Sequence, residues 1–166
     1  MKKLLLFSVL IPLLIGLAGC QSPVEIAIGS YTYHASGDIT LGGERYLITD
    51  EKGEMEMIYL QDNTLLLTFS ADNGGAYTTQ ATINQQEIEI APFNRSMEVK
   101  YTVRENSLLG GPTNIEKTES YSVDVYGEGQ IYGETIILDL RYDGHGLTDN
   151  KKLIGKKITL IAKKVE

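Results

Sequence analysis

Strict alternation of apolar and polar residues dominates the chain after Pro23 and constrains its fold more than any other feature. Met97, Val99, Tyr101 and Val103 occupy alternate positions along one segment, and charged or hydroxyl residues separate them. Successive side chains of a β-strand point to opposite faces, so such a segment buries one face and leaves the other in water. The pattern predicts antiparallel strands over a common core.

The same alternation recurs between clusters of turn-forming residues. It is found at Ile88-Ile90, Tyr121-Val123-Val125, Ile136-Leu138-Leu140-Tyr142 and Ile158-Leu160-Ala162. Turn signals rich in Gly, Asn and Asp fall at Ser36-Gly37-Asp38, Gly42-Gly43, Lys52-Gly53, Asp62-Asn63, Asp72 to Gly75, Asn84-Gln85-Gln86, Pro92 to Arg95, Gly127-Glu128-Gly129 and Asp143 to Gly146. Gly and Asn tolerate the positive φ that hairpins require. The spacing predicts about eight to ten strands joined as an up-and-down meander.

Closure of that meander into a barrel is the expected architecture. A flat sheet of so many strands has two unprotected edges, and closure removes them. We expect one all-β domain over residues 25–166, with a lipocalin-like barrel as its fold. A β-sandwich is the alternative, because alternation specifies the buried face and not how the sheet closes. The longest connection, residues 105–119, contains Gly110-Gly111-Pro112 and is predicted to be a loop over a barrel mouth.

The N-terminus reads as an export signal. Lys2 and Lys3 precede an almost uninterrupted apolar run over residues 4–17, which contains Pro12. A membrane-spanning helix needs about 20 apolar residues, so the run is too short to span a bilayer. We predict that residues 1–19 are a removable signal peptide.

The segment Leu17-Ala18-Gly19-Cys20 resembles the bacterial lipobox, in which the cysteine thiol receives diacylglycerol before cleavage on its N-terminal side. The resemblance implies lipidation of Cys20, a palmitate-type acylated anchor, and a short tether over residues 20–24. A buried cysteine after an ordinary signal peptide is the alternative. Gln21 differs from the Asp that retains lipoproteins at the inner membrane, so we expect the outer membrane of the cell envelope. The acidic run that marks surface export is missing, which favours the periplasmic face.

The charge of the chain and its cysteine content limit the partners and cross-links that we expect. The chain has 15 basic and 22 acidic residues, and residues 1–19 contain two of the basic ones and no acidic one, so the mature domain has a formal charge of −9. This charge argues against nucleic acid as a partner and against an electrostatic grip on anionic lipid. Membrane attachment is therefore expected to come from the acyl chains. Cys20 is the only cysteine, so the domain has no internal disulfide.

The mature chain resembles the lipocalin- and calycin-like lipoproteins of Bacteroidota. Gly29-Ser30-Tyr31 lies where lipocalins place a Gly-x-Trp motif, residues 129–142 resemble their late hairpin, and the chain has no Trp. The resemblance implies that Tyr31 plugs one end of the barrel and that Arg141 packs on this plug. It also implies a lumen that holds a small lipophilic ligand. Met97, Tyr101 and Tyr121 are then expected to line the ligand site, and the alternative is that they are ordinary core residues.

No motif for catalysis or metal binding is found. His34 and His145 are far apart and lie in no metal-ligand spacing, with His34 expected at a strand end and His145 in a turn. We therefore expect a non-enzymatic protein without metal or cofactor. The leading hypothesis is a membrane-anchored envelope lipoprotein that binds a small lipophilic ligand. The alternative is a protein-binding accessory or inhibitor module that acts through its loops.

Overall fold

The computed structural model describes residues 22–72, 75–106 and 111–165. The predicted signal peptide and the predicted lipidation site Cys20 lie outside these residues. Within the described ranges, no helix is both long enough and apolar enough to cross a membrane.

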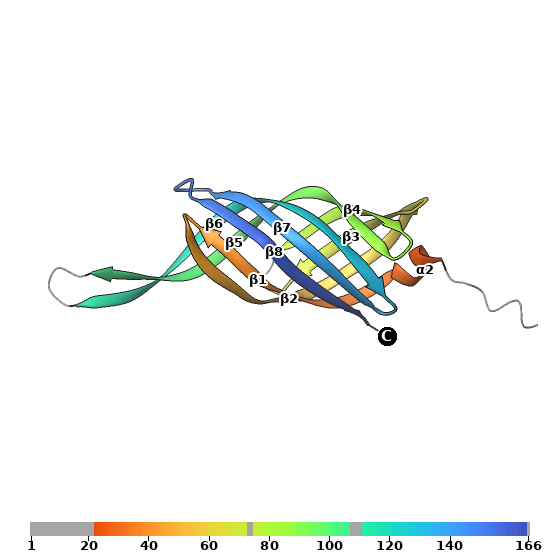
Figure 1. Ribbon diagram of the computed structural model, residues 1–166, viewed down its shortest axis with the longest axis horizontal. Coiled ribbons are helices and arrows are strands. Elements are labelled where there is room, and N and C mark those ends of the chain that lie inside the picture. Colours follow the sequence, from red (N-terminus) through yellow and green to blue (C-terminus); the bar gives the residue numbers. More distant parts are fainter. Residues whose placement is uncertain (1–21, 73–74, 107–110, 166) are drawn as a thin grey trace, which may run out of the picture.

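Eight antiparallel strands follow one another around a closed barrel in chain order, and β8 pairs with β1 to close it (Figure 1). The strands are β1 (Gly29–Leu41), β2 (Glu44–Gln61), β3 (Thr64–Ala71), β4 (Ala76–Asn84), β5 (Glu87–Asn106), β6 (Pro112–Tyr132), β7 (Thr135–Gly146) and β8 (Lys152–Lys164). The predicted meander and its closure are confirmed, and the sandwich alternative is wrong.

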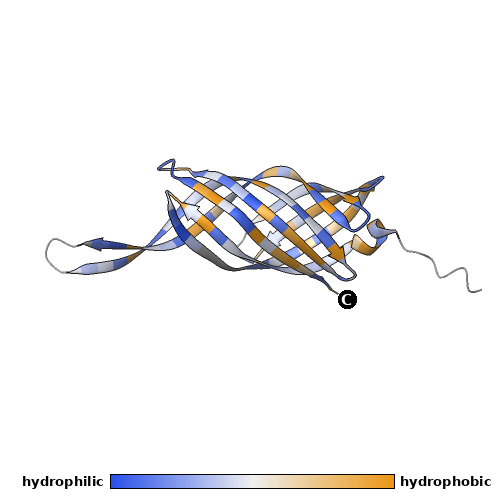
Figure 2. Ribbon diagram, viewed as in Figure 1, coloured by the Kyte–Doolittle hydropathy of each residue, from blue (hydrophilic) through white to orange (hydrophobic). Residues whose placement is uncertain are grey.

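The alternating residues form the core inside this barrel. On β7, for example, Ile136, Leu138, Leu140 and Tyr142 are buried, whereas the residues between them are partly or fully exposed. Figure 2 shows the resulting stripes of hydrophobic and hydrophilic residues along the strands. Full burial of each large apolar side chain contributes about 1.5–3 kcal/mol. Because there is no disulfide, this interior holds the fold together.

A short helix, α2 (Pro23–Ala27), covers one end of the barrel (Figure 1). Ser22 caps it by a capping box with Glu25, in which the Ser22 amide donates to the Glu25 carboxylate at 2.9 Å. Ala27 is buried, and its carbonyl accepts a 2.8 Å hydrogen bond from the Tyr31 hydroxyl. Burial raises the pKa of Tyr31 to about 12. The expected tether over residues 20–24 is therefore wrong at its end, because Pro23 and Val24 belong to a capped helix.

Several predicted turns are instead places where strands approach closely. Gly53, Gly127, Gly129 and the segment 143–146 lie inside strands, and the segments at 36–38 and 92–95 lie at strand irregularities. A methyl group at Gly53 would lie 2.2 Å from the Ser70 carbonyl oxygen. Glycine inside a strand commonly marks such an approach. The turn signals at Gly42-Gly43, Asp62-Asn63 and Gln85-Gln86 are confirmed.

The segment predicted as a mouth loop is instead a two-stranded ribbon. β5 and β6 stay paired as far as Asn106 and Pro112, whereas β6 pairs with β7 only from Tyr121 onward. The ends of β5 and β6 therefore project beyond the barrel (Figure 1). Water reaches both faces there, so alternation weakens and the sequence resembles a loop. We call residues 102–106 and 112–118 the β5–β6 ribbon.

Candidate functional site

The barrel wall contains a line along which two strands run without backbone pairing. The β3–β4 hairpin is shorter than β2 and β5. β2 therefore pairs with β3 only from Gly53 to Gln61, and β5 pairs with β4 only from Glu87 to Ile90. Among the described residues no register joins β2 to β5. Between residues 44–51 of β2 and residues 91–103 of β5, the described contacts are made by side chains, with Glu51 against Arg95 and Tyr46 against Tyr101. We call this line the β2–β5 seam.

Half-buried apolar side chains gather along the seam. Six hydrophobic residues are only partly buried against the core, and four of them lie on strands at the seam: Tyr46 on β2, Tyr77 on β4, and Phe93 and Met97 on β5. The Tyr77 ring stacks between Phe69 and Phe93, with centroid distances of 4.9 and 5.1 Å. Stacked rings of this kind contribute about 0.5–1.5 kcal/mol per pair beyond the area that they bury. The seam thus presents an ordered apolar surface to solvent.

A buried ion pair forms the floor of the seam. Arg95 on β5 donates to both carboxylate oxygens of Glu51 on β2, at 2.9 and 2.8 Å, and also to the Tyr77 hydroxyl at 2.8 Å. The Arg95 and Glu51 side chains are 6% and 10% exposed. The bidentate pair therefore joins the two strands where the backbone does not.

The surroundings of Arg95 keep it charged. The guanidinium lies 4.9 Å from the Tyr77 ring centroid and 5.2 Å from that of Tyr142, on opposite elements of the wall. Burial alone would lower the pKa of Arg95, but the hydrogen bonds with Glu51 and the nearby tyrosine oxygens raise it above its ordinary value. Burial also raises the pKa of Tyr77 and Tyr142, which stay protonated.

One hydrogen-bond donor of this cluster is unsatisfied. The buried Nε of Arg95 has no hydrogen-bond partner among the described residues. An unsatisfied buried donor costs about 1–3 kcal/mol. Such exceptions are few in native proteins.

A polar cluster closes the mouth at the ribbon end of the seam. The Tyr121 hydroxyl donates to Glu119 at 2.8 Å, and Lys151 Nζ lies 3.3 Å from Glu119 and 3.4 Å from the Tyr101 hydroxyl. The Tyr46 and Tyr101 rings meet edge to face across the seam, 5.3 Å apart. Hydrogen bonds from Tyr101, Tyr121 and Lys151 lower the pKa of Glu119.

The three residues predicted to line a ligand site are not all in one place. Met97 is half-buried at the seam, and Tyr101 lies at the mouth next to Tyr46. Tyr121 is fully buried inside the barrel. Sequence reasoning missed Arg95 and Glu51, although Arg95 falls on the same alternate positions as Met97, and an arginine in an apolar register is a signal for a buried partner.

Three other sequence predictions are corrected. Arg141 does not pack on the barrel plug, because alternation turns it outward between buried Leu140 and Tyr142, where it lies 3.4 Å from Glu128. His145 is an exposed strand residue of β7 and not a turn residue, and His34 lies within β1, away from its ends. In the described part of the chain, no group of three or more His, Cys, Asp or Glu side chains is placed to hold a metal ion.

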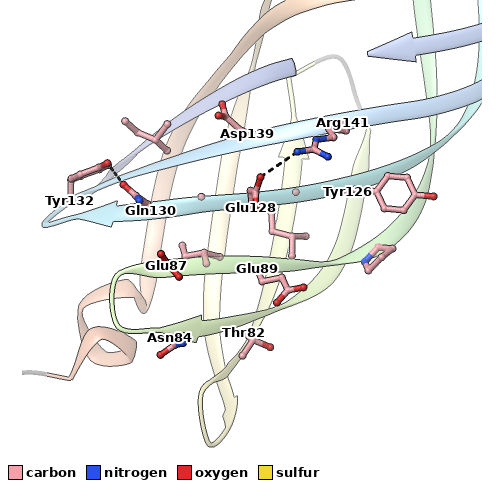
Figure 3. Close-up of a pocket in the computed structure, with 16 residues that line it drawn as sticks. Thr82, Asn84, Glu87, Glu89, Tyr126, Glu128, Gln130, Tyr132, Asp139 and Arg141 are labelled. Atoms are coloured by element: carbon pink, nitrogen blue, oxygen red, sulfur yellow. Dashed lines mark hydrogen bonds and ion pairs between the residues drawn. The ribbon is translucent and has the colours of Figure 1, made fainter. Parts of the chain in front are cut away.

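A groove of about 770 Å³ crosses the outer wall over β4 to β7 (Figure 3). The carboxylates of Glu87, Glu89, Glu128 and Asp139 lie around it, and Arg141 pairs with Glu128. The buried Ile88 and Ile90 also line the groove.

Comparison with known proteins gives structural neighbours only. No family model matches the chain, and no curated protein sequence is similar to it. The redesigned β-barrel b11L5F_LGL is similar at a TM-score of 0.38 and 12% identity, covering 90% of this chain and 100% of its own. The redesigned β-barrel mFAP1 bound to DFHBI is similar at a TM-score of 0.41 and 10% identity, covering 87% of this chain and 100% of its own.

Proposed function

We propose that this protein is a non-enzymatic lipoprotein of the bacterial cell envelope that binds a small lipophilic ligand at the β2–β5 seam. Lipid on Cys20 anchors it to the outer membrane, on the periplasmic face. The proposal keeps the lipocalin-like character expected from the sequence but moves the ligand from the lumen to the wall. The observation that carries it is the row of half-buried apolar side chains along an unpaired line of a closed barrel.

The interior itself favours the seam over the lumen. Tyr33, Phe69 and Tyr77 form a chain of ring contacts into the barrel, and the Arg95–Glu51 pair lies beside them. Eight strands enclose space for one small ligand or for side chains, and in this barrel side chains occupy the centre. A ligand that covers Tyr46, Phe93 and Met97 would bury apolar surface at about 25 cal/mol per Å² without displacing the ion pair.

Titration with the neutral fluorophore Nile red tests this site. We use a soluble form of the chain that begins at Gln21 and compare Met97→Gln with Ile161→Gln, which changes an exposed residue of β8 outside the seam. The native chain should bind one dye per barrel. Met97→Gln should weaken binding about tenfold, because an amide replaces an apolar contact. Equal affinity for both variants would refute the seam as the ligand site.

A protein-binding role is the second candidate, and the β5–β6 ribbon favours it. Its two strands pair only with each other, so both outer edges carry free backbone groups that can add a strand from a partner. Val103 and Ile115 are paired with each other across the ribbon, and Ile115 is exposed.

Shortening the ribbon separates the two functions. Replacing residues 105–113 by Asn-Gly joins the paired residues Arg104 and Asn114 through a tight hairpin turn. A protein-binding ribbon predicts that this variant loses a co-purifying envelope protein while its melting temperature and its Nile red affinity stay unchanged. A partner that is retained by the shortened chain would refute that role.

A further inference from the structure

Exposed apolar side chains concentrate at the end of the barrel that α2 covers. These are Ile28, Ile58, Tyr59, Leu60, Tyr132 and Val165. They come from the α2–β1 junction, the ends of β2 and β6, and the chain after β8, which lie at one end of the barrel (Figure 1). We call this set the α2-end patch. At the opposite end, the exposed large hydrophobic residues of the described chain are Ile115 and Leu147.

The tip of the β2–β3 hairpin shows why this patch is unlike an ordinary barrel surface. Ile58, Tyr59 and Leu60 are consecutive, and all three are exposed, so neither face of the strand is covered. A strand that ends in water would carry polar residues at such positions. Tyr and aliphatic residues together are typical of the interface between a bilayer and water.

A cleft of about 750 Å³ adjoins the patch between α2 and the neighbouring hairpin turns. Pro23, Val24, Ile28, Tyr59 and Ile83 line its apolar part. The helix cap at Ser22 also lines this cleft, so the chain leads from here toward the N-terminus.

The length of chain before Ser22 fixes the distance to the proposed anchor. Cys20 is two residues before Ser22, and two extended residues span about 7 Å. A lipid on Cys20 therefore holds the α2 end of the barrel against the membrane surface. A lipid at this position would keep the α2-end patch within reach of the bilayer.

We propose that the α2-end patch is a membrane-docking surface that inserts its apolar side chains at the bilayer interface. The inference rests on the proposed lipidation of Cys20. In this orientation the α2 end of the barrel faces the membrane. The β5–β6 ribbon and the mouth of the seam face away from it. Charges near the patch are of both signs, with Glu25 and Asp62 against Lys163 and Lys164, so insertion and not attraction to anionic lipid drives the contact.

A thiol-linked environment-sensitive fluorophore (NBD) tests the docking in the full-length lipoprotein. An acylated Cys20 leaves an introduced cysteine as the single free thiol. Leu60→Cys probes the patch, and Ile115→Cys is its matched control, since the two positions are 43% and 38% exposed. In liposomes of phosphatidylethanolamine and phosphatidylglycerol, the fluorophore at position 60 should shift to the blue and be quenched by spin-labelled lipid, while position 115 shows neither effect. Phosphatidylcholine liposomes should give the same result.

The outcomes separate docking from anchoring. Protein that stays in solution would overturn the anchor and the docking together. Protein that is bound to liposomes with equal quenching at both positions, or with stronger quenching at position 115, would overturn the docking alone. Tyr59→Cys repeats the test at a second exposed position, and the melting temperature of each labelled protein shows that the barrel is folded.

Discussion

Arg95 and Glu51 face each other across a stretch of the described barrel wall where β2 and β5 are not joined by their backbones. The guanidinium meets the carboxylate through two hydrogen bonds of 2.9 and 2.8 Å, between residues that are 44 positions apart in the chain. The pair connects β2 to β5, as backbone hydrogen bonds connect neighbouring strands elsewhere in the barrel. It also lies directly beneath the surface that we propose as the ligand site.

Breaking this pair on one side should destabilise the protein strongly. Arg95→Met leaves the Glu51 carboxylate buried without its partner, which costs about 3–5 kcal/mol of the free energy of unfolding. The double variant Arg95→Met/Glu51→Met removes both charges and should be more stable than Arg95→Met alone. Urea unfolding of the two single variants and the double variant measures this coupling. Strictly additive losses would show that the two side chains act independently.

Stability should fall in acid partly through Glu119. Hydrogen bonds from Tyr101 and Tyr121 lower the pKa of Glu119 from its ordinary value of 4.5. A lowered folded-state pKa gives stability that is complete above 4.5 and is lost as the pH falls through the folded pKa. Glu119→Gln should therefore flatten the acid limb of a plot of unfolding free energy against pH. An acid limb that is the same in Glu119→Gln as in the native chain would contradict this role of Glu119.

The inward glycines of β6 should differ in their tolerance of a methyl group. At Gly129 the added carbon would lie 2.1 Å from the Ile137 carbonyl oxygen, whereas at Gly127 its nearest neighbour is the tip of the Leu140 side chain. Backbone cannot move aside as a side chain can, so Gly129→Ala should cost about 1–3 kcal/mol and Gly127→Ala less. Thermal melts of both variants rank the two costs. A reversed ranking would contradict the packing described here.

The proposed anchor makes a prediction about processing. Cys20→Ser removes the thiol that accepts diacylglycerol, so the precursor should accumulate with its signal peptide and leave the lipoprotein-bearing membrane fraction. Intact mass and cell fractionation measure both effects. A processed, membrane-bound Cys20→Ser protein would show that another feature holds the chain at the membrane.

The sequence predicted the barrel because alternation over residues 97–101 and 136–142 reports burial of one face directly. The same rule failed for the β5–β6 ribbon, where both faces are wet, and for α2, whose five residues are too few to show a helical period. Glycines at positions 53 and 129 resembled turns because close approach and chain reversal both require glycine. Arg95 lies in an apolar register, which signals a buried partner, but its partner Glu51 has no local signature, since only closure of the barrel brings these residues together.

Amide hydrogen exchange with and without Nile red, measured on the soluble chain by mass spectrometry, tests the proposed ligand site most directly. Backbone groups at the seam have free edges, so peptides over residues 44–51 and 91–103 should exchange faster than the paired strands β7 and β8. Saturating dye should slow exchange in these two segments and leave β7 and β8 unchanged. Protection confined to strands away from the seam, or no protection at saturation, would contradict ligand binding at the β2–β5 seam.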